Sequence, residues 1–111
     1  WTKGVGEGRI NLHQFVDCAS TQAAKLFGLF PRKGTVAVGA DADLVIWDPK
    51  YRGTISAKNQ YMNLDYNPFE GWKVTGRPSL VTVRGEVAVK DGKFVGKLGR
   101  GKLVKREPNH F

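Results

Sequence analysis

The sequence predicts a mixed α/β fold in which two short helices precede a series of mainly antiparallel strands. Helical spacing of apolar residues is confined to residues 1–30, and after Gly34 the apolar pattern becomes extended. From residue 81 onward, turn signals separate successive apolar stretches, which is typical of antiparallel neighbours. With 111 residues, 41% of them hydrophobic and 25% charged, the chain has the composition of one globular unit.

The first predicted helix begins after Asn11, a residue type that favours the N-cap position. The apolar residues Leu12, Phe15, Val16 and Ala19 follow at i, i+3, i+4 and i+7, so they lie on one helix face. The pattern therefore predicts a short amphipathic helix.

A second helix follows, with Ser20 or Thr21 as its expected N-cap. Its apolar side is formed by Ala23, Ala24, Leu26 and Phe27. Gly28 lies where a left-handed C-terminal residue is favoured, and Pro31 prevents further helix.

The best core strand is the apolar run at residues 44–47, bounded by Asp43 and by Asp48-Pro49. An unbroken apolar run of this length predicts a strand covered on both faces. Such a strand implies a second sheet or a helical layer, which this chain barely supplies.

The last strands form a predicted meander. Apolar and polar residues alternate over residues 81–84 and again over residues 87–90, with Gly85 at the turn between them. Asp91-Gly92 is a hairpin signal that leads into residues 93–95. Before the meander, residues 59–70 predict a loop packed by its aromatic residues Tyr61, Tyr66 and Phe69.

Few side chains could perform catalysis. A hydrolytic metal site needs several converging His, Asp, Glu or Cys ligands, whereas His13 and His110 lie at opposite ends of the sequence. Asp41, Asp43 and Asp48 flank the entry to a strand, where carboxylates commonly accept backbone N–H bonds. We therefore expect no catalytic residue, no cofactor-binding residue and no metal ligand in this chain.

Other functional classes are also disfavoured. The glycines of residues 96–102 have the spacing of a phosphate-binding loop, but Leu103 replaces the Ser or Thr that holds magnesium, and no helix follows. No apolar run approaches the roughly 18 residues of a membrane span. Cys18 is the only cysteine, which excludes an internal disulfide and favours a reducing, cytoplasmic location.

The net charge of +8 is concentrated near the end of the sequence, where residues 91–111 contain six basic and two acidic side chains. Residues 93–106 contain a single aromatic residue, Phe94, so base stacking is poorly supported and nucleic-acid binding is disfavoured. A charged, glycine-containing extension that docks on a neighbouring subunit explains the pattern equally well.

Several stretches resemble the dihydropyrimidinase and D-hydantoinase branch of the metal-dependent amidohydrolases. Residues 20–35 and 39–48 are similar to the passage from the last barrel helices into the β-sandwich that many amidohydrolases share. The segment DYNPFEGWKVTGRP at residues 65–78 is more specific to hydantoinases and dihydropyrimidinases. Residues 81–94 and 99–102 resemble the final strands and tail of bacterial members.

This resemblance implies the C-terminal fragment of a TIM-barrel amidohydrolase. Residues 1–30 would be terminal barrel helices, residues 31–95 sandwich strands and residues 96–111 a basic tail. The opening at Trp1 fits a piece of a longer protein. The parent would open dihydropyrimidine or hydantoin rings to N-carbamoyl amino acids, using two zinc ions and a carboxylated lysine located upstream. The segment alone would be inactive.

The resemblance also implies partners. We expect this chain to pack against its own upstream barrel and N-terminal sandwich strands, in a homodimer or homotetramer. The expected interface residues are Phe94, Lys102, Leu103 and Arg106. Two alternatives remain: a segment of a non-catalytic dihydropyrimidinase-related scaffold protein, against which the short tail argues, and an autonomous basic binding module.

Overall fold

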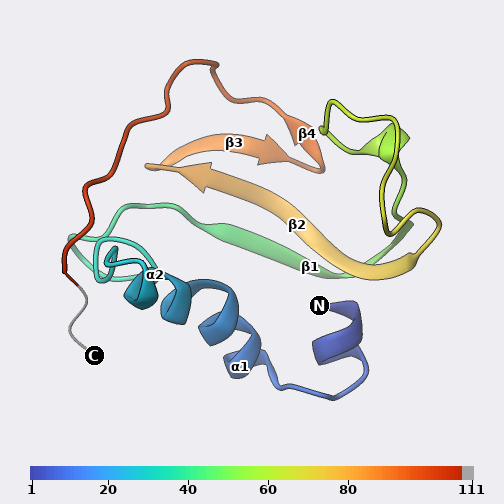
Figure 1. Ribbon diagram of the computed structural model, residues 1–111, viewed down its shortest axis with the longest axis horizontal. Helices are drawn as coiled ribbons and strands as arrows, with labels where there is room; N and C mark the ends of the chain where they lie inside the picture. The colour runs from blue at the N-terminus through green and yellow to red at the C-terminus, as the bar shows by residue number, and fades with distance from the viewer. Residues whose placement is uncertain (109–111) are drawn as a thin grey trace.

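The computed structural model describes residues 1–108 and contains one antiparallel sheet flanked by a helical segment (Figure 1). The strands are β1 (Val45–Thr54), β2 (Lys73–Val83), β3 (Glu86–Lys90) and β4 (Lys93–Phe94). They are ordered β1-β2-β3-β4, so each strand pairs with its neighbour in sequence. Two short α-helices before a four-stranded antiparallel sheet confirm the predicted order of elements. None of the described helices is long and apolar enough to cross a membrane.

The helical segment begins as predicted. After a π-helical turn at Thr2–Gly6, Asn11 caps helix α1 (Leu12–Val16). The Asn11 side chain accepts from the backbone N–H of Gln14, and the Gln14 side chain accepts from the backbone N–H of Asn11, both at 2.9 Å. This reciprocal capping satisfies two N–H groups that the first helical turn would otherwise leave unpaired.

The predicted break between the helices is wrong. A π-helical stretch at Asp17–Thr21 joins α1 to α2 (Gln22–Leu26), and Figure 1 shows them as one continuous ribbon. Thr21 has helical dihedral angles and caps nothing; its hydroxyl instead donates to the carbonyl of Gly34 at 2.8 Å. No cap is needed there because the helical backbone is continuous, and the N–H of Gln22 donates to the carbonyl of Asp17.

The end of α2 confirms the prediction for Gly28. Gly28 has φ +65°, and its N–H donates to the carbonyl of Lys25, while the N–H of Leu29 donates to the carbonyl of Ala24. These two bonds define a Schellman motif, for which glycine is favoured because a Cβ would oppose the positive φ.

Both hairpins of the meander are confirmed. Val83 pairs with Glu86 across Arg84-Gly85, and Lys90 pairs with Lys93 across Asp91-Gly92. All four turn residues have positive φ between 50° and 80°, as type I′ turns require. The sequence signals at Gly85 and Asp91-Gly92 therefore located both turns, although an irregularity between Val81 and Thr82 shifts the β2–β3 register.

The described residues do not themselves cover both faces of residues 44–47. The strand forms and pairs with β2, but Val45 and Ile46 are 56% and 57% exposed. β1 also continues through Pro49 to Thr54, with an irregular register between Asp48 and Arg52. The apolar run at residues 44–47 predicts a buried strand, but the described residues leave much of it exposed.

Exposure is high over the whole chain. Its accessible surface is 8776 Å², whereas a folded monomer of 12.3 kDa leaves about 6,100 Å² exposed. The radius of gyration is 15.6 Å, against about 13 Å for a compact domain of this length. Ala24 is the only buried hydrophobic side chain among the described residues. The fold therefore presents a large apolar surface that its own elements do not cover.

The described strands form a single antiparallel sheet. One further expectation needs correction. The loop at residues 59–70 is not packed by its tyrosines, because Tyr61 and Tyr66 are 75% and 64% exposed. Phe69 is half-exposed and contacts Trp72 edge-on at 5.2 Å.

Candidate functional site

No metal-binding cluster occurs among residues 1–108, where no three His, Cys, Asp or Glu side chains come together. His13 lies exposed on α1, and Cys18 is a free, exposed thiol on the following helical turn. His110 lies outside the described residues. The donor groups within the described part of the chain therefore do not fit a zinc site, and no catalytic step is assigned to them.

A charge network joins the loop before β1 to the first hairpin of the meander. The ammonium group of Lys33 pairs with Asp41 at 2.8 Å and with Asp43. Asp43 also accepts from the backbone N–H of Arg84 at 2.7 Å, and Arg32 pairs with Asp41 at 3.0 Å. Of the three aspartates that flank the entry to β1, Asp41 and Asp43 are thus structural cross-links.

The network shifts the pKa values of its members. Hydrogen bonds from Lys33 and then Arg32 hold the pKa of Asp41 below its usual value. Burial alone would raise the pKa of Asp43, but hydrogen bonds from Lys33 and from the backbone N–H of Arg84 outweigh it and lower the pKa. Burial opposes the charge of Lys33, yet its two carboxylate partners raise its pKa. All three groups are therefore stabilised in their charged forms, which suits cross-linking rather than proton transfer.

The third aspartate is also structural. The carboxylate of Asp48 accepts from the backbone N–H of Lys50 at 2.9 Å, inside the irregular part of β1. This local bond is the turn-forming role predicted from the sequence.

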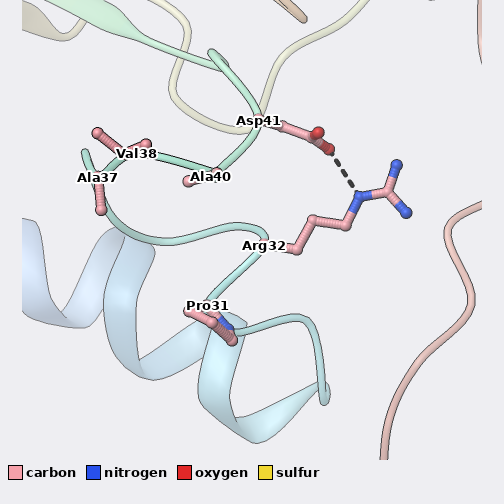
Figure 2. A pocket seen from close by; sticks show the side chains of 7 residues that line it. Pro31, Arg32, Ala37, Val38, Ala40 and Asp41 are labelled. Carbon is pink, nitrogen blue, oxygen red and sulfur yellow. Dashed lines mark hydrogen bonds and ion pairs between the residues drawn. The ribbon is translucent and has the colours of Figure 1, made fainter.

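A hollow of about 570 Å³ lies beside this network (Figure 2). Its lining consists of Pro31, Arg32, Ala37, Val38, Gly39, Ala40 and Asp41. Figure 2 shows Arg32 and Asp41 pointing toward one another, so the two charged groups of the lining already neutralise each other. The remaining lining is small and apolar, and the hollow offers no nucleophile paired with a base.

The contact between the helical segment and the sheet is aromatic. The Trp1 ring lies 5.5 Å from the Phe15 ring and 5.2 Å from the Trp47 ring, and Phe15 lies 5.8 Å from Trp47. A Cβ at Gly76 would come within 2.7 Å of Trp47 Nε1 and 2.8 Å of Trp1 Cδ1. We call these four residues the aromatic junction. Sequence reasoning missed it, although a glycine inside a strand signals a close approach.

The four expected interface residues do not form one cluster. Phe94 lies in β4, where its N–H donates to the phenol oxygen of Tyr61 at 3.0 Å. Lys102, Leu103 and Arg106 lie exposed on the tail, with Leu103 95% exposed. Figure 1 shows the tail running from β4 along the outside of the sheet to the end of α2.

The tail is anchored within its own chain. Arg100 lies 3.0 Å from the carboxylate of Glu86, and the N–H of Glu107 donates to the carbonyl of Gly28 at 2.8 Å. A Cβ at Gly28 would come within 2.1 Å of the Glu107 carbonyl oxygen, so this glycine serves both the helix end and the tail. The exposed residues between these anchors are free to contact other surfaces.

Residues 2–88 match the amidohydrolase family. The chain belongs to the amidohydrolase family. Over 106 residues, this amidohydrolase chain is 62% identical to the D-hydantoinase of Geobacillus stearothermophilus, covering 96% of the chain and 22% of the relative. It is also 45% identical to the dihydropyrimidinase of Rattus norvegicus over 108 residues, covering 97% of this chain and 21% of the relative.

A solved structure agrees. The D-hydantoinase (dihydropyrimidinase) from Thermus sp. superposes with a TM-score of 0.94 at 68% identity, covering 99% of this chain and 24% of that one. The expected resemblance to hydantoinases and dihydropyrimidinases is thereby confirmed. The amidohydrolase chain spans less than a quarter of the length of these relatives.

Proposed function

We propose that this chain is the C-terminal structural and assembly segment of a longer cyclic amidohydrolase, which opens hydantoin or dihydropyrimidine rings to N-carbamoyl amino acids. The single observation that supports this most is the 62% identity to a D-hydantoinase over nearly the whole chain. The uncovered apolar surface supports the structural role, because it is the kind of surface that another layer of protein covers.

The catalytic groups belong, in this proposal, to other parts of the longer protein. Two zinc ions with a carboxylated lysine would be held there, since the described residues lack a ligand cluster. The upstream barrel and N-terminal sandwich strands would cover the exposed face of β1. A cytoplasmic location completes the proposal, and the exposed, unpaired thiol of Cys18 suits a reducing compartment.

The activity is tested on the full-length protein with hydantoin and dihydrouracil, by quantifying the N-carbamoyl products. Ring opening by the full-length protein, with none above background from the purified 111-residue chain in the presence of zinc, is the expected result. An inactive full-length protein that still binds zinc would contradict the hydrolase assignment. Activity of the 111-residue chain itself would contradict the structural role.

We also propose that the tail contributes to a homodimer or homotetramer through Phe94, Lys102, Leu103 and Arg106. Truncation of the full-length protein after Gly96 removes the last three of these residues and the anchor at Glu107. The truncated protein is expected to dissociate at higher concentrations than the intact one, as followed by light scattering over a dilution series. An unchanged mass at every concentration would contradict this role.

A further inference from the structure

Arg77, in β2, is held rigidly by its neighbours. Its guanidinium carbon lies 4.2 Å from the centre of the Tyr51 ring. That ring lies over Gly53, because a Cβ there would come within 2.2 Å of the phenol oxygen. Arg77 Nη1 would also lie 3.3 Å from a Cβ at Gly92. The guanidinium thus packs against both an aromatic ring and a hairpin turn, which restricts its side-chain freedom.

This cation lacks an acceptor among the described residues. Its Nε atom is enclosed without a hydrogen-bond partner, and its terminal nitrogens make no hydrogen bond or ion pair with residues 1–108. Asp48, which faces Arg77 across the β1–β2 register, uses its carboxylate on Lys50 instead. A guanidinium has five donors in a planar fork, and the described residues supply no acceptor to those of Arg77.

We propose that Arg77 is the receptor for a carboxylate, donated by an acidic segment of the longer polypeptide that covers this part of the sheet. The planar fork of arginine matches a carboxylate with two parallel hydrogen bonds. Confinement by Tyr51 and Gly92 means that little further entropy is lost on binding. The proposal rests on the proposed function only in requiring a longer protein.

Charge complementarity favours such a segment over a second copy of this chain. The chain carries a net charge of +8, so a second copy would bring more positive charge toward Arg77. Carboxylates of seven of the ten acidic residues already accept hydrogen bonds or ion pairs within the chain. The side chains that remain are those of Asp65, Asp91 and Glu107.

Zero-length coupling tests the proposal in the full-length protein. Arg77→Lys places an amine in the receptor, and a water-soluble carbodiimide joins that amine to a touching carboxylate as an amide, while the reagent takes up the lost water and becomes a urea. Peptide mass spectrometry then identifies the acid. The matched control is Arg52→Lys, because Arg52 is exposed in β1 and donates only to carbonyls of its own strand.

The expected result is coupling from position 77 to one Asp or Glu outside these 111 residues, without such coupling from position 52. Coupling to Asp65, Asp91 or Glu107 of a second copy, recognised in mixed isotope-labelled samples, would overturn the proposal. Coupling no greater than that of the control would overturn it as well. If the full-length protein opened no cyclic amide but still gave the expected coupling, the proposed function would be contradicted and the carboxylate contact at Arg77 would be supported.

A charge exchange separates recognition from simple packing. Arg77→Met is expected to lower the ratio of folded to unfolded protein by about tenfold to a hundredfold, because it leaves a covered carboxylate unpaired. Arg52→Met should change the ratio by less than about threefold. Combining Arg77→Glu with a lysine in place of the identified acid is expected to restore most of the loss. Failure of that combination to exceed Arg77→Glu alone would refute the carboxylate contact.

Discussion

The aromatic junction and the loop at residues 59–70 contain the same kinds of side chain with opposite surroundings. In the junction, Trp1, Phe15 and Trp47 come from three separate segments and touch one another within 5.8 Å. In the loop, Tyr61 and Tyr66 keep most of their surface exposed. Aromatic content therefore does not identify a core, because burial depends on whether distant segments of the same chain reach the ring.

The strongest way to break the junction is Gly76→Ala. The residue has φ +74°, and the added methyl would lie 2.7 Å from Trp47 Nε1, so backbone strain and overpacking combine. We expect the free energy of unfolding of the full-length protein to fall by about 3 kcal/mol, measured by urea denaturation.

Gly71→Ala is the matched control for that substitution. Gly71 has φ +82° with open space around it, so only the backbone cost of about 1 kcal/mol is expected. Equal losses at positions 71 and 76 would show that the junction is not tightly packed.

The charge network at Lys33 gives the next largest effect. Asp43→Asn removes a charged acceptor from the 2.7 Å bond with the Arg84 N–H and weakens the contact with Lys33. We expect a loss of about 1–2 kcal/mol in the free energy of unfolding. Asp65→Asn, in the loop, should change it by less than about 0.5 kcal/mol, and a larger loss there would argue that the loop is covered by charged contacts.

The same network predicts a dependence on pH. Folding lowers the pKa values of Asp41 and Asp43. Their contribution to the free energy of unfolding is therefore complete above the pKa of aspartate in the unfolded chain, about 3.9. This stabilising contribution is lost as the pH falls from about 3.9 through the lower pKa values of the two aspartates in the folded protein. Urea midpoints between pH 7 and pH 3 should therefore fall less in an Asp41→Asn/Asp43→Asn variant than in the parent. Parallel curves would contradict this linkage.

The smallest expected effect tests how the loop is attached. Tyr61→Phe removes the acceptor of the Phe94 N–H, which is exposed enough to bond water instead. We expect a loss of about 0.5 kcal/mol, and about zero for Tyr66→Phe, which removes a hydroxyl from an exposed ring. Melting curves of the two variants make the comparison, and a large loss for Tyr66→Phe would indicate a partner over that ring.

Elements defined by local chemistry were predictable. Asn11 with Gln14 closes the start of the helix, Gly28 ends it, and both hairpins form where the sequence predicted turns, at Gly85 and at Asp91-Gly92. The errors concern where elements end. No break occurs at Thr21, because the N–H of Gln22 donates to the carbonyl of Asp17 and the helical backbone continues. β1 runs past Pro49 because β2 continues beside it.

The candidate sites follow the same division. The structural role of the aspartates was predictable from their place before a strand. The aromatic junction and the confined Arg77 were not predictable, since each joins residues more than 20 positions apart. No local pattern contains such a pairing.

By itself, the sequence determined the order of helices and strands, the positions of the hairpin turns and the resemblance to cyclic amidohydrolases. It did so because caps, turns and apolar periodicity act over a few neighbouring residues. Only the tertiary structure decided that the apolar run of β1 stays half-exposed, that the tail returns to Gly28 and that Arg77 stacks on Tyr51. Those outcomes depend on which distant surfaces meet, and burial is a property of the assembled surfaces rather than of any single segment.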